Sequence, residues 1–170
     1  NFLEGGAAIN VLARHIGAKV IVVDCGVASY LKAHPLLKIK KIGLGTNNMA
    51  VGPAMSRDAA IQSIEAGIEL IEEELAEGID IVGTGDMGIA NTTPSSAILS
   101  VLGRMDVVSA TGRGTGLDEE SIQRKIHVIK KAIDVNQPNP NDAIDVLAKV
   151  GGYEIGGLAG LCLGAARYRI

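Results

Sequence analysis

The chain has 170 residues, which is long enough for one domain with a sizeable core. Hydrophobic residues make up 47% and charged residues 21%, which excludes a disordered protein, and with only 2% aromatics the core is expected to be aliphatic. The formal net charge of −3 provides no overall field to attract nucleic acid or an anionic membrane.

Cysteine and histidine are few and scattered along the chain. Cys25 and Cys162 form no CxxC motif, so we expect two reduced thiols of a cytosolic protein, and the three histidines lack metal-ligand spacing, so no zinc site is expected. From Asn1 the sequence runs at once into a helical pattern, which is not the pattern of a signal peptide, and it ends at Ile170 just after another helical pattern. We therefore expect a fragment of a longer protein.

The first half of the chain predicts a helix, a buried parallel strand, a long loop and a second helix. In chain order these elements cover residues 4–16, 19–24, 30–55 and 56–77. The first helix has an apolar stripe on one face, formed by Ile9, Leu12, Ala13 and Ile16. Ser56 is a plausible N-cap of the second helix. The loop at 30–55 is expected either to be mobile or to cover a site.

The second half alternates between strands and helices. The predicted strands cover residues 79–82 and 107–109, and the predicted helices cover 94–102, 118–135, 142–150 and 153–167. This alternation predicts a single α/β domain over residues 1–170, a mostly parallel sheet flanked by helices with a Rossmann-like core. Gly156, Gly160 and Gly164 recur at every fourth position of the last helix, which we expect to pack closely in the interior, because its apolar stretch is too short for a bilayer.

A glycine-rich turn, Gly83 to Gly88, follows the predicted strand at 79–82 and matches the G-x-G-x-x-G pattern of dinucleotide-binding proteins. Two features oppose that interpretation. The acidic residue expected at the end of the next strand is missing, since Asp106 comes before that strand. Thr93 as N-cap and Pro94 as first helical residue also start the next helix later than the pattern requires.

The same turn can instead hold an anion, because glycines let backbone N–H groups approach a ligand and the following helix contributes its positive end. A second turn, Gly112 to Gly116, follows the next predicted strand at the same sheet edge. Lys125 lies about two turns into the next helix and is long enough to reach a phosphate. The candidate phosphate- and ribose-binding residues are Gly85, Gly88, Asn91, Thr92, Thr93, Gly112, Arg113, Gly114, Thr115, Gly116 and Lys125. A tight loop without a ligand is the alternative for each turn taken alone.

Two carboxylates are candidates for chemistry beside this anion. Asp86, inside the first turn, would be costly next to a phosphate but useful next to a ribosyl cation or a ring nitrogen. Asp24, at the end of the first predicted strand, could serve in the same way or could cap the turn at Gly26.

Several long motifs resemble those of nicotinate-nucleotide–dimethylbenzimidazole phosphoribosyltransferases of cobalamin biosynthesis, in order along the whole chain. They cover residues 1–10 (NFLEGGAAIN), 85–94 (GDMGIANTTP), 112–116 (GRGTG), 136–140 (NQPNP) and 150–152 (VGG). The resemblance implies transfer of the 5-phosphoribosyl group of nicotinate mononucleotide to a benzimidazole. The products are α-ribazole phosphate and nicotinate, with inversion at the anomeric carbon and neither metal nor other cofactor.

The resemblance also implies a binding or catalytic role for particular residues. The two glycine turns and Lys125 would anchor the 5′-phosphate, and Asp86, where the family usually has Glu, would be a catalytic carboxylate. The family's principal catalytic Glu lies in a Gly-rich motif beyond Ile170, and part of the benzimidazole pocket precedes Asn1, so this chain alone is expected to be inactive or nearly so. A cytoplasmic homodimer that acts on small molecules, without nucleic acid or membrane, is implied as well. A nicotinamide-dinucleotide-binding oxidoreductase domain and a non-catalytic binding or assembly module remain the alternatives.

Overall fold

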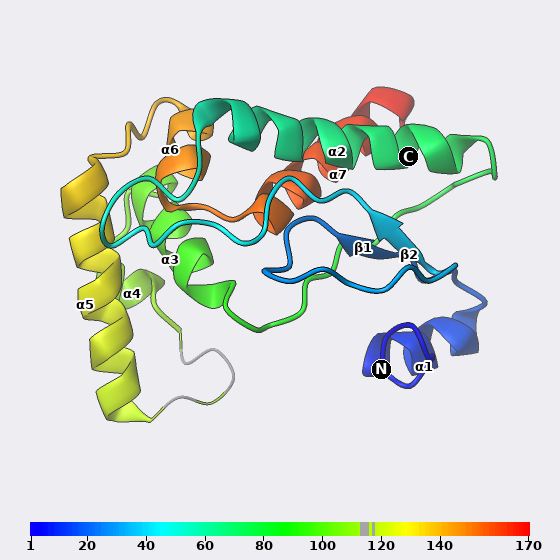
Figure 1. Cartoon of the computed structure of the whole chain (residues 1–170), viewed down its shortest axis with the longest axis horizontal. Coiled ribbons are helices and arrows are strands. Elements are labelled where there is room, and N and C mark those ends of the chain that lie inside the picture. The colour runs from blue at the N-terminus through cyan, green and yellow to red at the C-terminus, as the bar shows by residue number, and fades with distance from the viewer. Residues whose placement is uncertain (113–115, 117) are drawn as a thin grey trace. The chain divides into compact units, whose positions relative to one another are not determined.

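The chain divides into two compact units, residues 1–45 and residues 46–170, in a computed structural model that describes residues 1–112, 116 and 118–170 (Figure 1). The prediction of one domain over residues 1–170 stays a prediction. Among the described residues no helix combines the length and the apolarity needed to cross a lipid bilayer.

The first unit holds one helix and two short strands. Helix α1 (Ala8–Ile16) ends at Gly17, whose φ of 69° is left-handed and suits a residue without a Cβ. Strand β1 (Val22–Asp24) pairs in parallel with β2 (Leu37–Ile39), with Val22 opposite Leu37. Of the apolar stripe of α1 only Ala13 is buried, whereas Ile9, Leu12 and Ile16 are exposed, because two three-residue strands offer little apolar surface.

Asp24 closes the turn that follows β1. Its Oδ1 accepts hydrogen bonds from the backbone N–H groups of Gly26 (3.0 Å) and Val27 (2.9 Å). Its Oδ2 lies 2.8 Å from Nζ of Lys41, which also donates to the carbonyl oxygen of Val27. The side chain is almost fully buried, so the carboxylate depends on these partners. Of the two roles considered for Asp24, turn capping is the one that this geometry supports.

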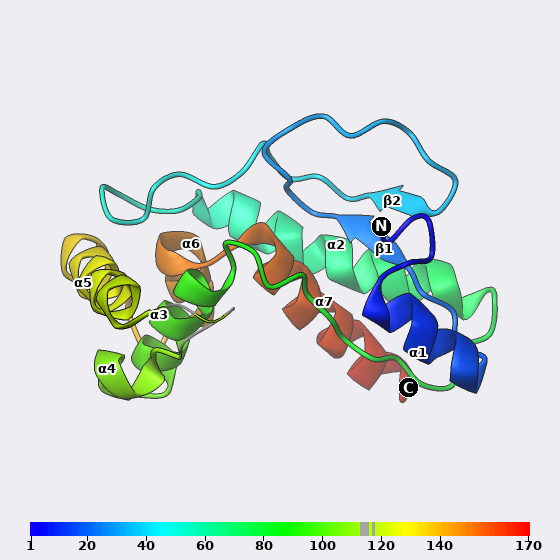
Figure 2. The same ribbon diagram turned by 90° about the horizontal axis from the view of Figure 1, so that it is seen from below.

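The second unit is helical, and its most extensive contact is the one between two helices that are far apart in the sequence. Helix α2 (Arg57–Leu75) and helix α7 (Tyr153–Tyr168) lie side by side in both views (Figures 1 and 2). Glycines at their contact allow the backbones to touch. A Cβ added at Gly160 would overlap the carbonyl oxygen of Ile64, and one at Gly67 would overlap that of Gly157. The predicted close packing of the last helix is confirmed.

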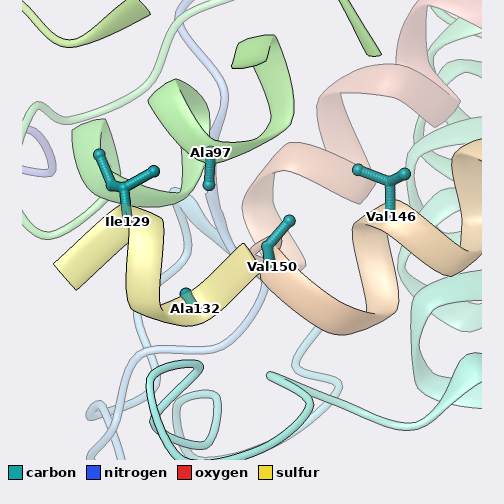
Figure 3. Packing of buried hydrophobic residues seen from close by; sticks show 5 residues of the cluster. All are labelled: Ala97, Ile129, Ala132, Val146 and Val150. Carbon is teal, nitrogen blue, oxygen red and sulfur yellow. The ribbon is translucent and has the colours of Figure 1, made fainter. Parts of the chain in front are cut away.

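The other helices of this unit build an aliphatic core. They are α3 (Thr92–Leu102), the short α4 (Val107–Ala110), α5 (Glu119–Asn136) and α6 (Ala143–Val150). Fully buried side chains of α3, α5 and α6 meet in one cluster that contains no aromatic residue (Figure 3). Its members are Ala97, Ile129, Ala132, Val146 and Val150. The aliphatic core expected from the composition is thus observed.

Two predicted strands are absent from the described structure. Residues 79–82 lie outside any strand, with Ile81 86% exposed, and residues 107–109 belong to α4, which Asp106 caps through its carboxylate. A strand needs a hydrogen-bonded neighbour, whereas a capped helical turn is satisfied locally. The fold is therefore a mixed helix–strand structure with a two-stranded parallel sheet, and the larger sheet of a Rossmann-like core is not observed among these residues.

The segment predicted as a loop at 30–55 is more ordered than expected. It contains β2, and its last part, residues 46–55, is anchored within the second unit. The backbone N–H groups of Ala54 and Met55 donate to the carbonyl oxygens of Lys149 and Ala148, and Asn136 donates its side-chain amide to the carbonyl oxygen of Met49. A covering role over a site is the expectation that this anchoring supports.

Candidate functional site

The start of α3 is tied to the glycine turn before it by one buried amide. Asn91, 8% exposed, precedes α3 and donates from Nδ2 to the carbonyl oxygen of Met87 at 2.7 Å. Its own carbonyl oxygen accepts from Oγ of Ser95. Helix α3 begins at Thr92, so the predicted start at Pro94 with Thr93 as N-cap is wrong by two residues. The consequence is that Thr92 and Thr93 lie in the first turn, at the positive end of α3.

Lys125 joins that helix start to the second glycine turn. Its Nζ donates to Oγ1 of Thr92 at 3.0 Å and lies 3.4 Å from the carbonyl oxygen of Gly112. The side chain is only 8% exposed, and burial lowers the pKa of Lys125 below its usual 10.5. Among the described residues no carboxylate forms an ion pair with it. The protein thus holds a desolvated cation where three predicted site residues meet.

A cavity of about 210 Å³ opens beside the start of α3, entirely within the second unit. Segment 46–54 supplies one wall, and the start of α3 with one residue each of α5 and the turn before α7 supplies the rest. Its lining residues are Thr46, Asn47, Asn48, Met49, Ala54, Ala90, Thr93, Pro94, Val128 and Gly151. Val128 follows Lys125 by one helical turn, so the cavity adjoins the buried cation. Amides, hydroxyls and apolar side chains together suit a small polar organic ligand.

The remaining predicted site residues are less constrained. Asp86 and Gly88 are exposed, and a Cβ at Gly85 would meet no atom within 4 Å. Gly116 has a left-handed φ of 94°, which favours glycine. Arg113, Gly114 and Thr115 lie outside the described residues.

Sequence reasoning missed the polar wall of the cavity. Thr46, Asn47 and Asn48 were part of a segment expected to cover a site, and their own side chains were not proposed as contacts. The only available signal was this cluster of three amide and hydroxyl side chains in a glycine-rich loop.

The dinucleotide interpretation finds no support in this geometry. Its pattern requires a strand, a tight glycine turn and a helix that begins at the turn. Residues 79–82 form no strand, and α3 begins four residues after Gly88. Among the described residues no group of His, Cys, Asp and Glu is arranged to hold a metal ion.

Known proteins resemble the chain over its whole length. A family model described as Phosphoribosyltransferase matches residues 1–170. Proteins named nicotinate-nucleotide–dimethylbenzimidazole phosphoribosyltransferase match it as well: the one from Roseiflexus sp. (strain RS-1) is 56% identical over 170 residues and the one from Desulforudis audaxviator 58%. This chain belongs to that phosphoribosyltransferase family.

Solved structures agree with the assignment to the phosphoribosyltransferase family. The crystal structure of CobT from Thermus thermophilus superposes with a TM-score of 0.93 at 38% identity, covering 99% of this chain and 50% of that one. A second structure, of a nicotinate-nucleotide–dimethylbenzimidazole phosphoribosyltransferase from the same organism, gives 0.89 at 36% identity. The chain spans about half the length of the curated relatives it matches, 48% in the case of the Roseiflexus protein.

Proposed function

We propose that this chain provides the phosphoribosyl-binding half of an enzyme that transfers the 5-phosphoribosyl group of nicotinate mononucleotide to 5,6-dimethylbenzimidazole. The bond between the anomeric carbon and the pyridine nitrogen breaks, and a benzimidazole nitrogen forms the new bond from the opposite face. A carboxylate takes the proton from the benzimidazole N–H. The products are α-ribazole phosphate and nicotinate, as in the assembly of the lower ligand of cobalamin.

The buried Lys125 is the observation that carries this proposal. An ammonium group has three N–H donors, and two of them have acceptors among the described residues. A phosphate oxygen would be a stronger acceptor than the carbonyl of Gly112, because a hydrogen bond between ionised groups is shorter and stronger than one to a neutral acceptor. The nearby end of α3 adds its dipole. We place the 5′-phosphate at Lys125, Thr92 and the Gly112 turn.

The other proposed contacts surround this anchor. They are the backbone and side chains of Gly85, Gly88, Asn91, Thr93, Arg113, Gly114, Thr115 and Gly116. Asp86 is proposed as a catalytic carboxylate that stabilises positive charge on the ribosyl group as the glycosidic bond lengthens. The segment with the family's principal catalytic Glu is not among these 170 residues, so we expect this chain to bind the donor nucleotide without turning it over.

Calorimetric titration tests the binding proposal. Nicotinate mononucleotide is expected to bind the chain at one site, because its phosphate can accept a hydrogen bond from the ammonium group of Lys125. NAD is the control ligand, since it has no terminal phosphate monoester. Binding of NAD without binding of the mononucleotide would favour the oxidoreductase alternative, and binding of neither would favour a non-catalytic module.

Turnover is expected to be absent even where binding is present. Incubation of the chain with nicotinate mononucleotide and 5,6-dimethylbenzimidazole should release no nicotinate above the uncatalysed rate, as followed by liquid chromatography. The Thermus thermophilus relative assayed in parallel is the positive control. Release of nicotinate at a comparable rate by this chain would refute the proposal that it binds the donor nucleotide without turning it over.

Pairing as a homodimer and a cytoplasmic location complete the proposal. Both follow from the resemblance to the family. Light scattering of the purified chain, with an expected mass twice that of the 17.6 kDa polypeptide, tests the first of them.

A further inference from the structure

One buried amide joins α5 to the polar wall of the cavity. Asn136, the last residue of α5, is almost fully buried and donates from Nδ2 to the carbonyl oxygens of Met49 (2.7 Å) and Ala132 (2.8 Å). Both of its amide hydrogens are therefore used inside the protein. Asn136 is the first residue of the motif at 136–140, and the proposed function assigns it no role.

The carbonyl group that Asn136 holds comes directly after Asn48, and the turn at Asn48 is closed by hydrogen bonds of its own. Oδ1 of Asn48 accepts from the backbone N–H of Ala50 at 3.0 Å, and its carbonyl oxygen accepts from those of Val51 and Gly52. These bonds fix the orientation of the Asn48 amide. Among the residues that the structure describes, its Nδ2 has no acceptor.

The cavity that Asn48 lines lies next to the proposed phosphate anchor. Val128 lines the same cavity and follows Lys125 by three residues, about one turn of α5. In a pentose 5-phosphate a single methylene group separates the phosphate from the sugar ring, so a phosphate at Lys125 brings the sugar to this cavity. A sugar hydroxyl can accept a hydrogen bond, which is the partner that Nδ2 of Asn48 lacks.

We propose that Asn48 donates a hydrogen bond to a ribose hydroxyl of the donor nucleotide and that Asn136 is the residue that positions Asn48. This inference rests on the proposed function and extends it from the phosphate to the sugar. Asn136 and Lys125 are both buried and lie eleven residues apart, close to three full turns, so they share one face of α5. One helix thus sets the spacing between the phosphate anchor and the sugar contact.

Ribose 5-phosphate and inorganic phosphate separate the sugar contact from the phosphate anchor. In calorimetry on the full chain, Asn48→Ala should raise the dissociation constant of ribose 5-phosphate about three- to tenfold, which is the loss of one neutral hydrogen bond. The dissociation constant of inorganic phosphate should not change. Asn136→Leu, which removes the donor at similar volume, should have the same two effects. Gln123→Leu, the same change at an exposed position of α5, is the matched control and should alter neither constant.

The double variant Asn48→Ala/Asn136→Leu tests whether Asn136 acts through Asn48. Because the sugar contact is already lost in Asn48→Ala, adding Asn136→Leu should weaken binding of ribose 5-phosphate by less than about twofold more. Two losses that multiply would refute the positioning role. Hydrogen exchange should be faster at the N–H of Ala50 in Asn136→Leu and unchanged at that of the buried Ile71 in α2. Faster exchange at both positions would show a general loss of stability and would also refute that role.

The outcomes distinguish this inference from the proposed function. If the original chain binds ribose 5-phosphate no more tightly than inorganic phosphate, or if Asn48→Ala weakens both ligands equally, the sugar contact is refuted while the phosphate anchor stands. If the original chain binds neither ligand, the proposed function fails and this inference fails with it.

Discussion

Replacing Gly160 with alanine is expected to destabilise the second unit by about 3 kcal/mol, close to the upper end of the cost of overpacking a core. The added Cβ would occupy the space of the Ile64 carbonyl oxygen, so α2 and α7 would have to separate. Backbone cannot give way as a flexible side chain can. This cost exceeds the roughly 1 kcal/mol that alanine gains over glycine in helix propensity. Urea unfolding followed by circular dichroism measures the difference.

A glycine in open surroundings provides the control for that substitution. A Cβ at Gly52 would meet no atom within 4 Å, and its φ is not left-handed. Gly52→Ala should change the free energy of unfolding by no more than about 1 kcal/mol. Equal effects at the two positions would mean that the helices do not touch at Gly160.

Lys125→Met is expected to weaken binding of nicotinate mononucleotide roughly 10- to 100-fold while leaving the chain folded. The loss corresponds to one hydrogen bond to a charged group, about 1.5–3 kcal/mol. Methionine is of similar length and fills the same space without a buried charge, so the free energy of unfolding should fall by no more than about 1 kcal/mol. Calorimetry gives the affinity, and urea unfolding gives the stability.

Lys130→Met is the matched control on the same helix, because Lys130 is exposed. It should change neither affinity nor stability. Equal losses of affinity in the two variants would indicate only a general effect of charge and would contradict a phosphate anchor at Lys125.

The stability of the original chain should depend on pH through the same residue. Because burial lowers the pKa of Lys125, the unfolded chain binds more protons than the folded one between that lowered pKa and 10.5. The contribution of Lys125 to the free energy of unfolding is therefore least favourable at pH values below the lowered pKa. It becomes more favourable as the pH rises from the lowered pKa to 10.5. The free energy of unfolding of the original chain, measured relative to that of Lys125→Met, should therefore increase as the pH rises toward 10.5.

The parts of the fold that sequence predicted well are those decided within a few residues. Ser56 and Asp118 were expected at helix starts, and each accepts a hydrogen bond from the backbone N–H three residues later. Such caps need nothing from the rest of the chain. The helix at 142–150 begins in the same way, with Asp142 as its N-cap.

The wrong predictions concern segments whose secondary structure depends on hydrogen-bonding partners outside the segment itself. Residues 79–82 and 107–109 both read as apolar strands, but an apolar run has no hydrogen-bonding partner of its own. The first stays unpaired, and the second becomes a helical turn because Asp106 caps it. Thr92 and Lys125 were both named as candidates, yet their contact across 33 positions could not be derived from spacing. The polar wall at Asn47 and Asn48 was missed for the same reason.

The pairing of α2 with α7 has a consequence for the order of events during synthesis. A ribosome makes residues 57–75 well before residues 153–168, so α2 emerges without the helix that its Gly67 surface contacts. Closing a loop of this length before the contact forms costs entropy and slows folding. The second unit can complete its packing only after nearly all of its residues have left the ribosome, and until then the bare surface of α2 is available to chaperones.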